Sequence, residues 1–159
     1  RMSTHTARLP IVGAAVLVAF GVNLALYELG RAAGGSFTYI QSGNKTTVDA
    51  LAVTIMSVGP LVVGLGLVAC LAPRWPRLIT AAKIAAPMLA LATIALMTVP
   101  AHFDTTSTIF LASMHLALIP ISLLAIAALD QRHSSLPARP RATAVVRTSR
   151  ATDSAAKRQ

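Results

Sequence analysis

Four long apolar stretches, separated by short polar segments, make up most of this 159-residue sequence. They cover about 9–29, 49–72, 77–99 and 107–129, and each is apolar on nearly every side. A helix needs about 20 residues to cross the roughly 30 Å hydrocarbon core of a bilayer, whereas buried strands are far shorter. The pattern therefore predicts an all-α membrane protein with four antiparallel transmembrane helices.

Prolines and polar residues mark the turns between these helices. The second and third spans are joined by a basic turn that holds Pro73, Arg74, Trp75, Pro76 and Arg77. The turn at 99–104 comes next, and we expect the hydroxyls of 105–108 to cap the fourth helix. The first connection, 30–47, is longer, and we expect its Phe37, Tyr39 and Ile40 to lie against the membrane interface. A short strand and a re-entrant turn remain open as alternatives there.

The basic residues concentrate at the C-terminal end. The formal charge of the chain is +9, and residues 131–159 hold seven Lys or Arg against one acid and no aromatic residue. Such a segment buries too little apolar surface to fold, so we expect a transmembrane domain at 1–130 and a disordered basic tail at 131–159. The tail is suited to anionic lipid. Nucleic acid is the weaker interpretation, because aromatic residues for base stacking are missing.

The distribution of positive charge predicts the orientation. One side of the bilayer collects the tail together with Arg1, Arg8, Arg74 and Arg77, whereas the other side holds Arg31 and Lys45. By the positive-inside rule, both termini are cytoplasmic in a multi-pass protein of the plasma membrane. Lys83 lies about 10 Å inside the third span, given the rise per residue. We expect it to snorkel and to form an inner-face anchor with Arg74, Trp75 and Arg77.

The sequence contains no recognisable catalytic set. The charged fraction of 12% is about half that of a soluble domain, which excludes a soluble enzyme core. Cys70 is the single cysteine, so no intramolecular disulfide forms, and we expect it to be a small packing residue. The motifs of P-loop proteins, α/β-hydrolases and zinc proteases are absent. We therefore expect no cofactor.

Polar residues inside the predicted spans need a partner or a function. Thr108, His115 and Ser122 recur every seven residues, which places them on one face of the fourth helix. Asn23 in the first span reaches nearly the same depth as His115. One interpretation is a hydrogen-bonded contact between Asn23 and His115 that fixes helix register. The other is proton transfer or ligand binding by His115, whose imidazole titrates near neutral pH.

A second group of titratable residues gathers at the predicted outer surface. It consists of Glu28, Asp49, His102 and Asp104. Carboxylates and an imidazole are suitable ligands for a divalent cation, so this cluster is a weak candidate metal site. The alternative is that Asp49 favours a helix N-terminus while Glu28 pairs with Arg31 or Lys45.

Small residues recur at helical spacing in two spans. Gly64 and Gly66 lie in the second span, and the third carries the pairs Ala81/Ala85, Ala82/Ala86 and Ala86/Ala90. Such residues allow helices in a membrane to approach closely.

The order of these elements resembles a family of uncharacterised four-helix integral membrane proteins from actinobacteria, known as a domain of unknown function. The resemblance covers roughly residues 8–130. It rests on Asn23, the basic turn at 73–77, the sequence Met114-His115-Leu116 and Pro120. It implies no activity, substrate or cofactor.

Together these features favour a membrane protein without catalytic activity of its own. We expect an accessory or scaffold subunit that associates with itself or with a larger membrane complex. One alternative is a proton-coupled or small-solute transporter that uses His115. The other is a membrane enzyme or metal sensor that uses the outer cluster.

Overall fold

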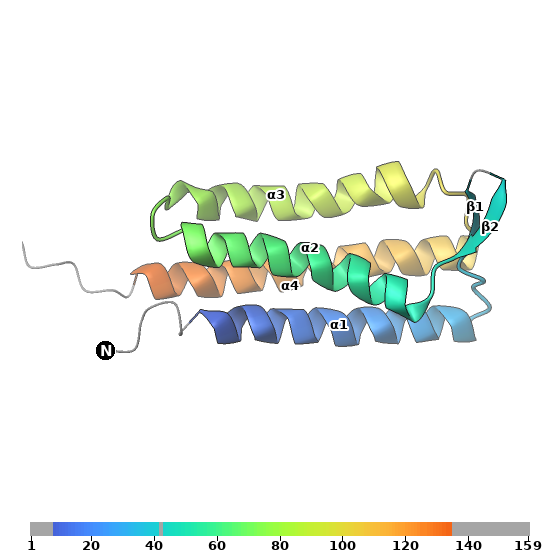
Figure 1. Cartoon of the computed structure of the whole chain (residues 1–159), viewed down its shortest axis with the longest axis horizontal. Helices are drawn as coiled ribbons and strands as arrows, with labels where there is room; N and C mark the ends of the chain where they lie inside the picture. Colours follow the sequence, from blue (N-terminus) through green and yellow to red (C-terminus); the bar gives the residue numbers. More distant parts are fainter. Residues whose placement is uncertain (1–7, 42, 135–159) are drawn as a thin grey trace, which may run out of the picture.

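The computed structural model describes residues 8–41 and 43–134, which form four long helices and one β-hairpin (Figure 1). The elements are α1 (Leu9–Ala32), β1 (Thr38–Gln41), β2 (Asn44–Thr47), α2 (Ala50–Leu71), α3 (Arg77–Thr93), the π-helix η1 (Ile94–Thr98) and α4 (Thr105–Ser134). The helices run alternately in opposite directions along one axis (Figure 1). We call the end with the β-hairpin the hairpin end, and the end where α1 begins and α4 finishes the basic end.

The predicted fold class is confirmed. Each helix has a segment long and apolar enough to cross a membrane: Leu9–Ala32, Ala50–Leu71, Arg77–Thr98 and Thr105–Gln131. The chain is thus a small multi-pass membrane protein. α4 continues to Ser134, so its last four residues belong to the segment predicted as the tail. The remainder of that prediction, residues 135–159, lies outside the described residues.

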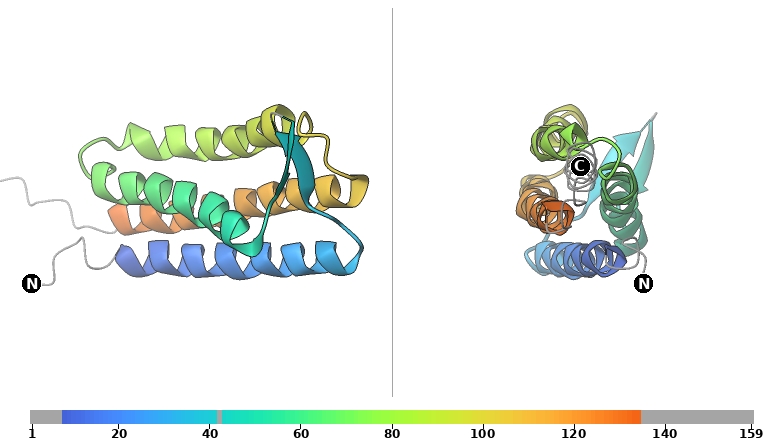
Figure 2. Two further views of the ribbon diagram at one scale, coloured as in Figure 1. Left: turned by 45° about the vertical axis from the view of Figure 1, so that its right-hand side comes forward. Right: turned by 90° about the vertical axis from the view of Figure 1, so that its left-hand side faces the viewer.

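The first connection contains the short strands that were one of the open alternatives. β1 and β2 pair antiparallel, with Thr38 opposite Thr47 and Gln41 opposite Asn44. Gly43 has a φ of 83°, a left-handed conformation that glycine adopts without steric penalty. The hairpin therefore turns tightly and lies across the ends of the helices (Figures 1 and 2).

The helices do not pack equally against one another. α1 packs against both α2 and α4, and α3 packs mainly against α4 with little contact to α2. Viewed along the bundle, α1 and α3 lie at opposite sides, with α2 and α4 between them (Figure 2). Consequently α3 is the least buried of the four candidate spans.

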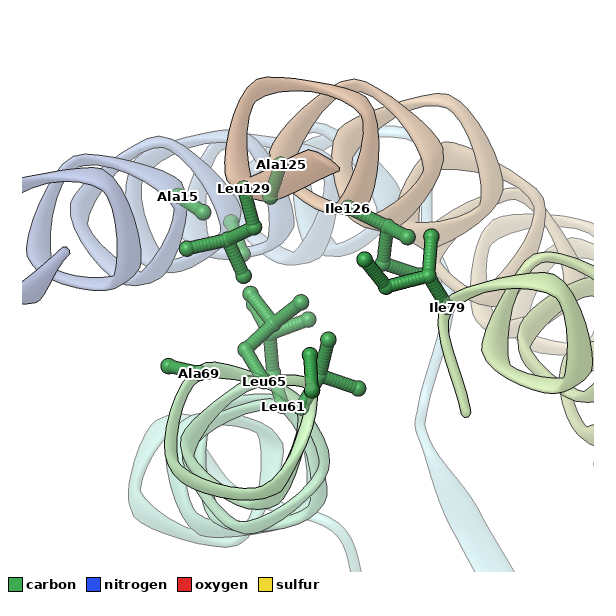
Figure 3. Close-up of a cluster of buried hydrophobic side chains, with 11 residues drawn as sticks. Ala15, Leu61, Leu65, Ala69, Ile79, Ala125, Ile126 and Leu129 are labelled. Atoms are coloured by element: carbon green, nitrogen blue, oxygen red, sulfur yellow. The ribbon is translucent and has the colours of Figure 1, made fainter. Parts of the chain in front are cut away.

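Two apolar clusters fill the interior. The larger one lies toward the basic end, where α1, α2, α3 and α4 meet (Figure 3), and includes Ala19, Leu65, Ile79, Ile126 and Leu129. The smaller one lies toward the hairpin end and consists of Tyr27, Phe37, Val53, Leu111 and Met114, with partly buried neighbours. Large apolar side chains on the outer faces of the helices remain exposed. In a bilayer these side chains face lipid, and a helix that faces both lipid and an apolar core is apolar on all sides.

A four-residue repeat builds the seam between α1 and α2. On α1 the buried positions include 15, 19, 23 and 27, and on α2 they include 53, 57, 61 and 65. Residues four apart lie on one helix face. In both rows the polar residue, Asn23 or Ser57, falls between the two apolar clusters.

Candidate functional site

A buried polar contact joins the first two helices. The Asn23 amide nitrogen of α1 donates a hydrogen bond to the Ser57 hydroxyl of α2 at 2.6 Å. Ser57 in turn donates to the backbone carbonyl of Val53, one turn earlier, at 2.7 Å. Both side chains are buried, and Asn23 is only 1% exposed. An interhelical bond of this kind stabilises a membrane bundle by roughly 0.6–2 kcal/mol.

The Asn23 side chain is only half satisfied. The amide nitrogen has a partner, but the amide oxygen, Oδ1, has none. Among the described residues, it is the one buried side-chain oxygen or nitrogen without a hydrogen bond. A buried polar atom without a partner is destabilising by about 1–3 kcal/mol. The Asn23–Ser57 bond therefore stabilises the helix pair less than a fully satisfied amide would.

His115 does not have the partner that the sequence suggested. Its Nδ1 lies 2.8 Å from the backbone carbonyl of Leu111 on the same helix. Because a carbonyl oxygen only accepts, Nδ1 carries the hydrogen, and in neutral His115 the Nε2 atom is an acceptor. The expected contact with Asn23 is thus replaced by a local bond on α4, and Asn23 bonds to Ser57.

The other two residues of the seven-residue row are also satisfied locally. Thr108 donates to the Phe103 carbonyl at 3.5 Å, and Ser122 donates to the Ile119 carbonyl at 2.9 Å. Ser122 is buried and Thr108 is partly buried. The row therefore exists as a face of α4, but each side chain bonds to a nearby backbone carbonyl and none reaches across to another helix.

The hairpin end is held together around Asp104. One carboxylate oxygen, Oδ2, accepts from the Ser36 backbone amide (3.1 Å), the Ser36 hydroxyl (2.7 Å) and the Ser107 hydroxyl (2.6 Å). The other, Oδ1, accepts from the Ser107 backbone amide at 2.9 Å. Asp104 thus caps α4, which corrects the expectation that the hydroxyls of 105–108 would do so. It also ties the loop after α1 to α4.

Asp104 is a carboxylate held in its charged form. Hydrogen bonds from the Ser107 hydroxyl and amide, and then from the Ser36 hydroxyl, lower its pKa well below the ordinary value. Donors of this kind stabilise the anion and not the neutral acid. Asp104 therefore stays ionised at any pH near neutrality.

Phe37 is a core residue and not an interface residue. Its side chain is 1% exposed and lies against Tyr27, with the ring centroids 4.9 Å apart. Its backbone amide donates to the Ser107 hydroxyl at 2.8 Å. The expectation of an interfacial Phe37 is thus wrong, because the loop turns back into the bundle. Ile40 does remain exposed, and Tyr39 lies against Phe103 with centroids 5.0 Å apart.

Two glycines make room for the Phe37 ring. A Cβ at Gly30 would lie 2.7 Å from the ring of Phe37 and 2.9 Å from Phe110. A Cβ at Gly35 would lie 2.9 Å from the Gly30 carbonyl oxygen. Separations below 3.0 Å are sterically excluded, so the hairpin end depends on both glycines.

The four candidate metal ligands are not brought together. Across residues 8–41 and 43–134, no group of three or more His, Cys, Asp or Glu side chains is placed to hold an ion. Asp49 caps α2 by accepting from the Ala52 amide at 2.7 Å, as its alternative assignment predicted. In the same residues Glu28 forms no ion pair, and Arg31 lies 5.9 Å from the centre of the Tyr27 ring. His102 lines a different feature.

A half-open pocket of about 690 Å³ lies beside the hairpin. One wall is the hairpin with the residue before it, and the other is the turn that follows η1. The lining residues are Ser36, Thr38, Tyr39, Ile40, Lys45, Thr47, Pro100, Ala101 and His102. The pocket was not predicted from the sequence, because its walls, residues 36–47 and 100–102, are far apart in the chain and meet only after folding.

At the basic end, two cationic side chains bind oxygen atoms of other helices. Arg8 is buried, and its guanidinium donates to the Ala69 carbonyl in the last turn of α2 at 2.9 Å. A cation there complements the helix dipole and satisfies a free carbonyl. Lys83 on α3 pairs with Asp130 on α4 at 2.8 Å. This ion pair was not predicted, although Asp130 is the one acid near the end of the fourth span.

The predicted anchor residues in the turn at the basic end are exposed. Arg74, Trp75 and Arg77 all face outward at the turn between α2 and α3. Cys70 is exposed as well, so it is not the packing residue that we expected. Gly64 and Gly66 also differ from expectation, because a Cβ on either would meet nothing within 4 Å.

Comparison with known proteins gives one finding. A family model described as a family of unknown function (DUF6069) matches residues 4–133. The comparison with curated proteins found no match, and the comparison with solved structures found none either.

Proposed function

We propose that this chain, which belongs to the DUF6069 family of unknown function, is a non-catalytic accessory or scaffold component of a membrane assembly. The observation that carries the proposal is the outward face of α3. This helix packs mainly against α4, and its other sides are free to contact another membrane helix.

The outward face of α3 has the composition of a helix contact. Ala81 and Ala85 lie four residues apart and are both exposed, beside exposed Ile84 and Met88. By contrast, Ala82 and Ala86 on the inward side pack against the larger apolar cluster, and Ala90 is buried. In a bilayer, small residues four apart let a second backbone approach closely, and van der Waals packing between the helices then competes with lipid. The small pair therefore favours a transmembrane helix of a partner subunit over lipid.

Cysteine crosslinking in native membranes tests the contact. In a Cys70→Ala background, Ala85→Cys labelled with a thiol-reactive benzophenone is expected to give a discrete crosslinked adduct upon irradiation. Leu124→Cys on α4 is a matched control, because Leu124 is exposed and lies at a similar distance from the basic end. The proposal fails if Ala85→Cys gives no adduct or if both variants crosslink equally.

We place the basic end of the bundle in the cytoplasm. Arg74, Arg77 and Lys83 lie toward that end, whereas Arg31 and Lys45 lie at the hairpin end. An excess of Lys and Arg favours the cytoplasmic side. In the Cys70→Ala background, a membrane-impermeant thiol reagent should label Lys45→Cys on intact cells and Arg74→Cys only after lysis. The opposite labelling would reverse the assignment.

A transporter based on His115 is less well supported. That hypothesis needs Asn23 to orient the imidazole, but Asn23 bonds to Ser57 and His115 bonds within α4. The pocket described above lies at the hairpin end, outside the candidate spans.

A further inference from the structure

The pocket at the hairpin end has the chemistry of an anion site. Its walls bring together the ammonium group of Lys45, the imidazole of His102 and the hydroxyls of Thr38 and Thr47. The two threonines face each other across the strands, with their hydroxyl oxygens 3.1 Å apart. No carboxylate is among the lining residues. Thr38 donates to the Ser36 carbonyl at 3.1 Å, so Thr47 donates to Thr38. The ammonium and the imidazole are therefore the groups that can form charge-assisted bonds to a phosphate.

The nearby Asp104 carboxylate is ionised, but its oxygens are engaged by other groups and not by Lys45. Asp104 follows the pocket turn, but its two oxygens accept four hydrogen bonds from Ser36 and Ser107. These bonds orient the carboxylate toward the loop and the start of α4. Lys45 is therefore not neutralised by an ion pair among the described residues.

The backbone at His102 adopts a left-handed conformation. Its φ is 52°, in the left-handed region that β-carbon sterics disfavour outside glycine, asparagine, aspartate and histidine. Strained backbone at a pocket wall is a recurrent mark of a binding site. Glycine would adopt this φ without steric penalty. The histidine at this position differs from glycine in placing an imidazole at the pocket wall.

The position of the pocket relative to the membrane identifies the source of the phosphate. The third candidate span ends at Thr98, and the pocket wall begins two residues later at Pro100. Large apolar side chains remain exposed along the approach, on η1 and just after it, at Leu96, Met97 and Val99. Ile40 in the pocket lining is exposed too. A lipid whose acyl chains lie along η1 would thus present its headgroup to the pocket.

We propose that the pocket between the hairpin and the turn after η1 binds the phosphate of an anionic phospholipid headgroup, through Lys45 and His102. This inference does not rest on the scaffold role, because it concerns the opposite end of the bundle from Ala85 and a different class of partner.

Native mass spectrometry of the full chain tests the proposal. The detergent-solubilised protein is titrated with phosphatidylglycerol and with phosphatidylcholine of the same acyl chains. The wild-type protein is expected to prefer phosphatidylglycerol. Lys45→Gln and His102→Gly should each weaken phosphatidylglycerol binding on the order of tenfold, the loss of one charge-assisted bond. Lys45→Arg should retain the preference.

Controls separate the pocket from general surface charge and from misfolding. Arg31→Gln removes a cation at the same end but outside the lining residues, so it should leave the preference unchanged. His102→Gly is compatible with the φ of 52°, and thermal unfolding of each variant checks that the bundle is intact. The proposal is overturned if both pocket variants bind as the wild-type protein does, or if Arg31→Gln loses as much.

A soluble phosphate ester is the remaining source of the same chemistry. Glycerol phosphate is therefore added as a competitor. Weak competition is expected, because it lacks the acyl chains that η1 would contact. If glycerol phosphate displaces phosphatidylglycerol at equal concentration, the ligand is a soluble phosphate ester and the assignment to lipid is wrong.

Discussion

Removing Ser57 should destabilise the bundle more than removing Asn23, although the two share one hydrogen bond. In Ser57→Ala the whole Asn23 amide is left buried without a partner, because Oδ1 already has none. In Asn23→Leu the polar group disappears, and Ser57 keeps its bond to the Val53 carbonyl. A stranded polar group is destabilising by about 1–3 kcal/mol, whereas apolar replacement of both partners is nearly neutral.

The magnitudes follow from these contacts. We expect Ser57→Ala to lower the free energy of unfolding by about 1–2 kcal/mol, within the range for buried bonds in membrane bundles. Asn23→Leu has the same number of heavy atoms and should change it by less than about 1 kcal/mol. Added to Ser57→Ala, Asn23→Leu should recover on the order of 1 kcal/mol. Any overpacking by leucine is present in both backgrounds, so a double-mutant cycle cancels it.

Reversible unfolding in mixed detergent micelles, or steric trapping in nanodiscs, measures these differences. Ser113→Ala is the matched control, because the Ser113 hydroxyl also donates to a carbonyl one turn earlier, at Ile109. The reasoning is refuted if Ser57→Ala is no more destabilising than Ser113→Ala, or if the coupling between positions 23 and 57 is zero within error.

Three further predictions concern the two ends of the bundle. Gly30→Ala places a Cβ 2.7 Å from the Phe37 ring and should lower the thermal midpoint clearly, whereas Gly13→Ala, whose Cβ meets nothing, should leave it equal or raise it. A thermal midpoint for Gly30→Ala equal to that of Gly13→Ala would contradict the packing described at the hairpin end. Asp104→Ala should destabilise by about 0.5–2 kcal/mol through loss of the α4 cap. Because hydrogen bonds lower the pKa of folded Asp104, its contribution is present above the ordinary pKa of about 3.9 and is lost as pH falls below it. The stability difference between Asp104→Ala and the wild-type protein should therefore be constant near neutral pH and shrink in acid, and a constant difference down to low pH would argue against the cap. Lys83→Ala should be destabilising by no more than about 1 kcal/mol, because the Lys83 and Asp130 side chains are 41% and 38% exposed. A double-mutant cycle with Asp130→Ala measures the coupling energy of the pair. A coupling energy well above this limit would show that the pair is effectively buried.

Much of the fold was predictable because it depends on local properties of the chain. Whether a segment crosses a membrane is decided by its length and apolarity, and the four spans were placed within a few residues of the helices. The capping of α2 by Asp49 could also be predicted from the sequence, because the two residues of the bond are three apart. The cap at Asp104 was missed because the hydroxyls after it were also good candidates, and Ser107 instead donates to Asp104.

The polar contacts were less predictable because they depend on which helix faces meet. Asn23, Ser57 and His115 all lie at comparable depth, so depth alone did not choose between the partners. The four-residue rows at 15, 19, 23, 27 and at 53, 57, 61, 65 contained a usable signal, because each places its polar residue between apolar ones on one face. One residue along a helix rotates a side chain by about 100°, so small differences in rotation change the neighbour entirely.

The sequence by itself thus determined a four-span membrane protein with its turns and one of its caps, because partition into a bilayer is a sum over residues close in the chain. Only the tertiary structure decided that Asn23 meets Ser57, that Phe37 enters the core through the space left by two glycines, and that Lys45 and His102 share a pocket. The Asn23–Ser57 bond and the bond that holds Phe37 to Ser107 join residues 34 and 70 apart in the chain, and the pocket joins segments that are also far apart. Their energies arise only when the helices take one rotation and one register.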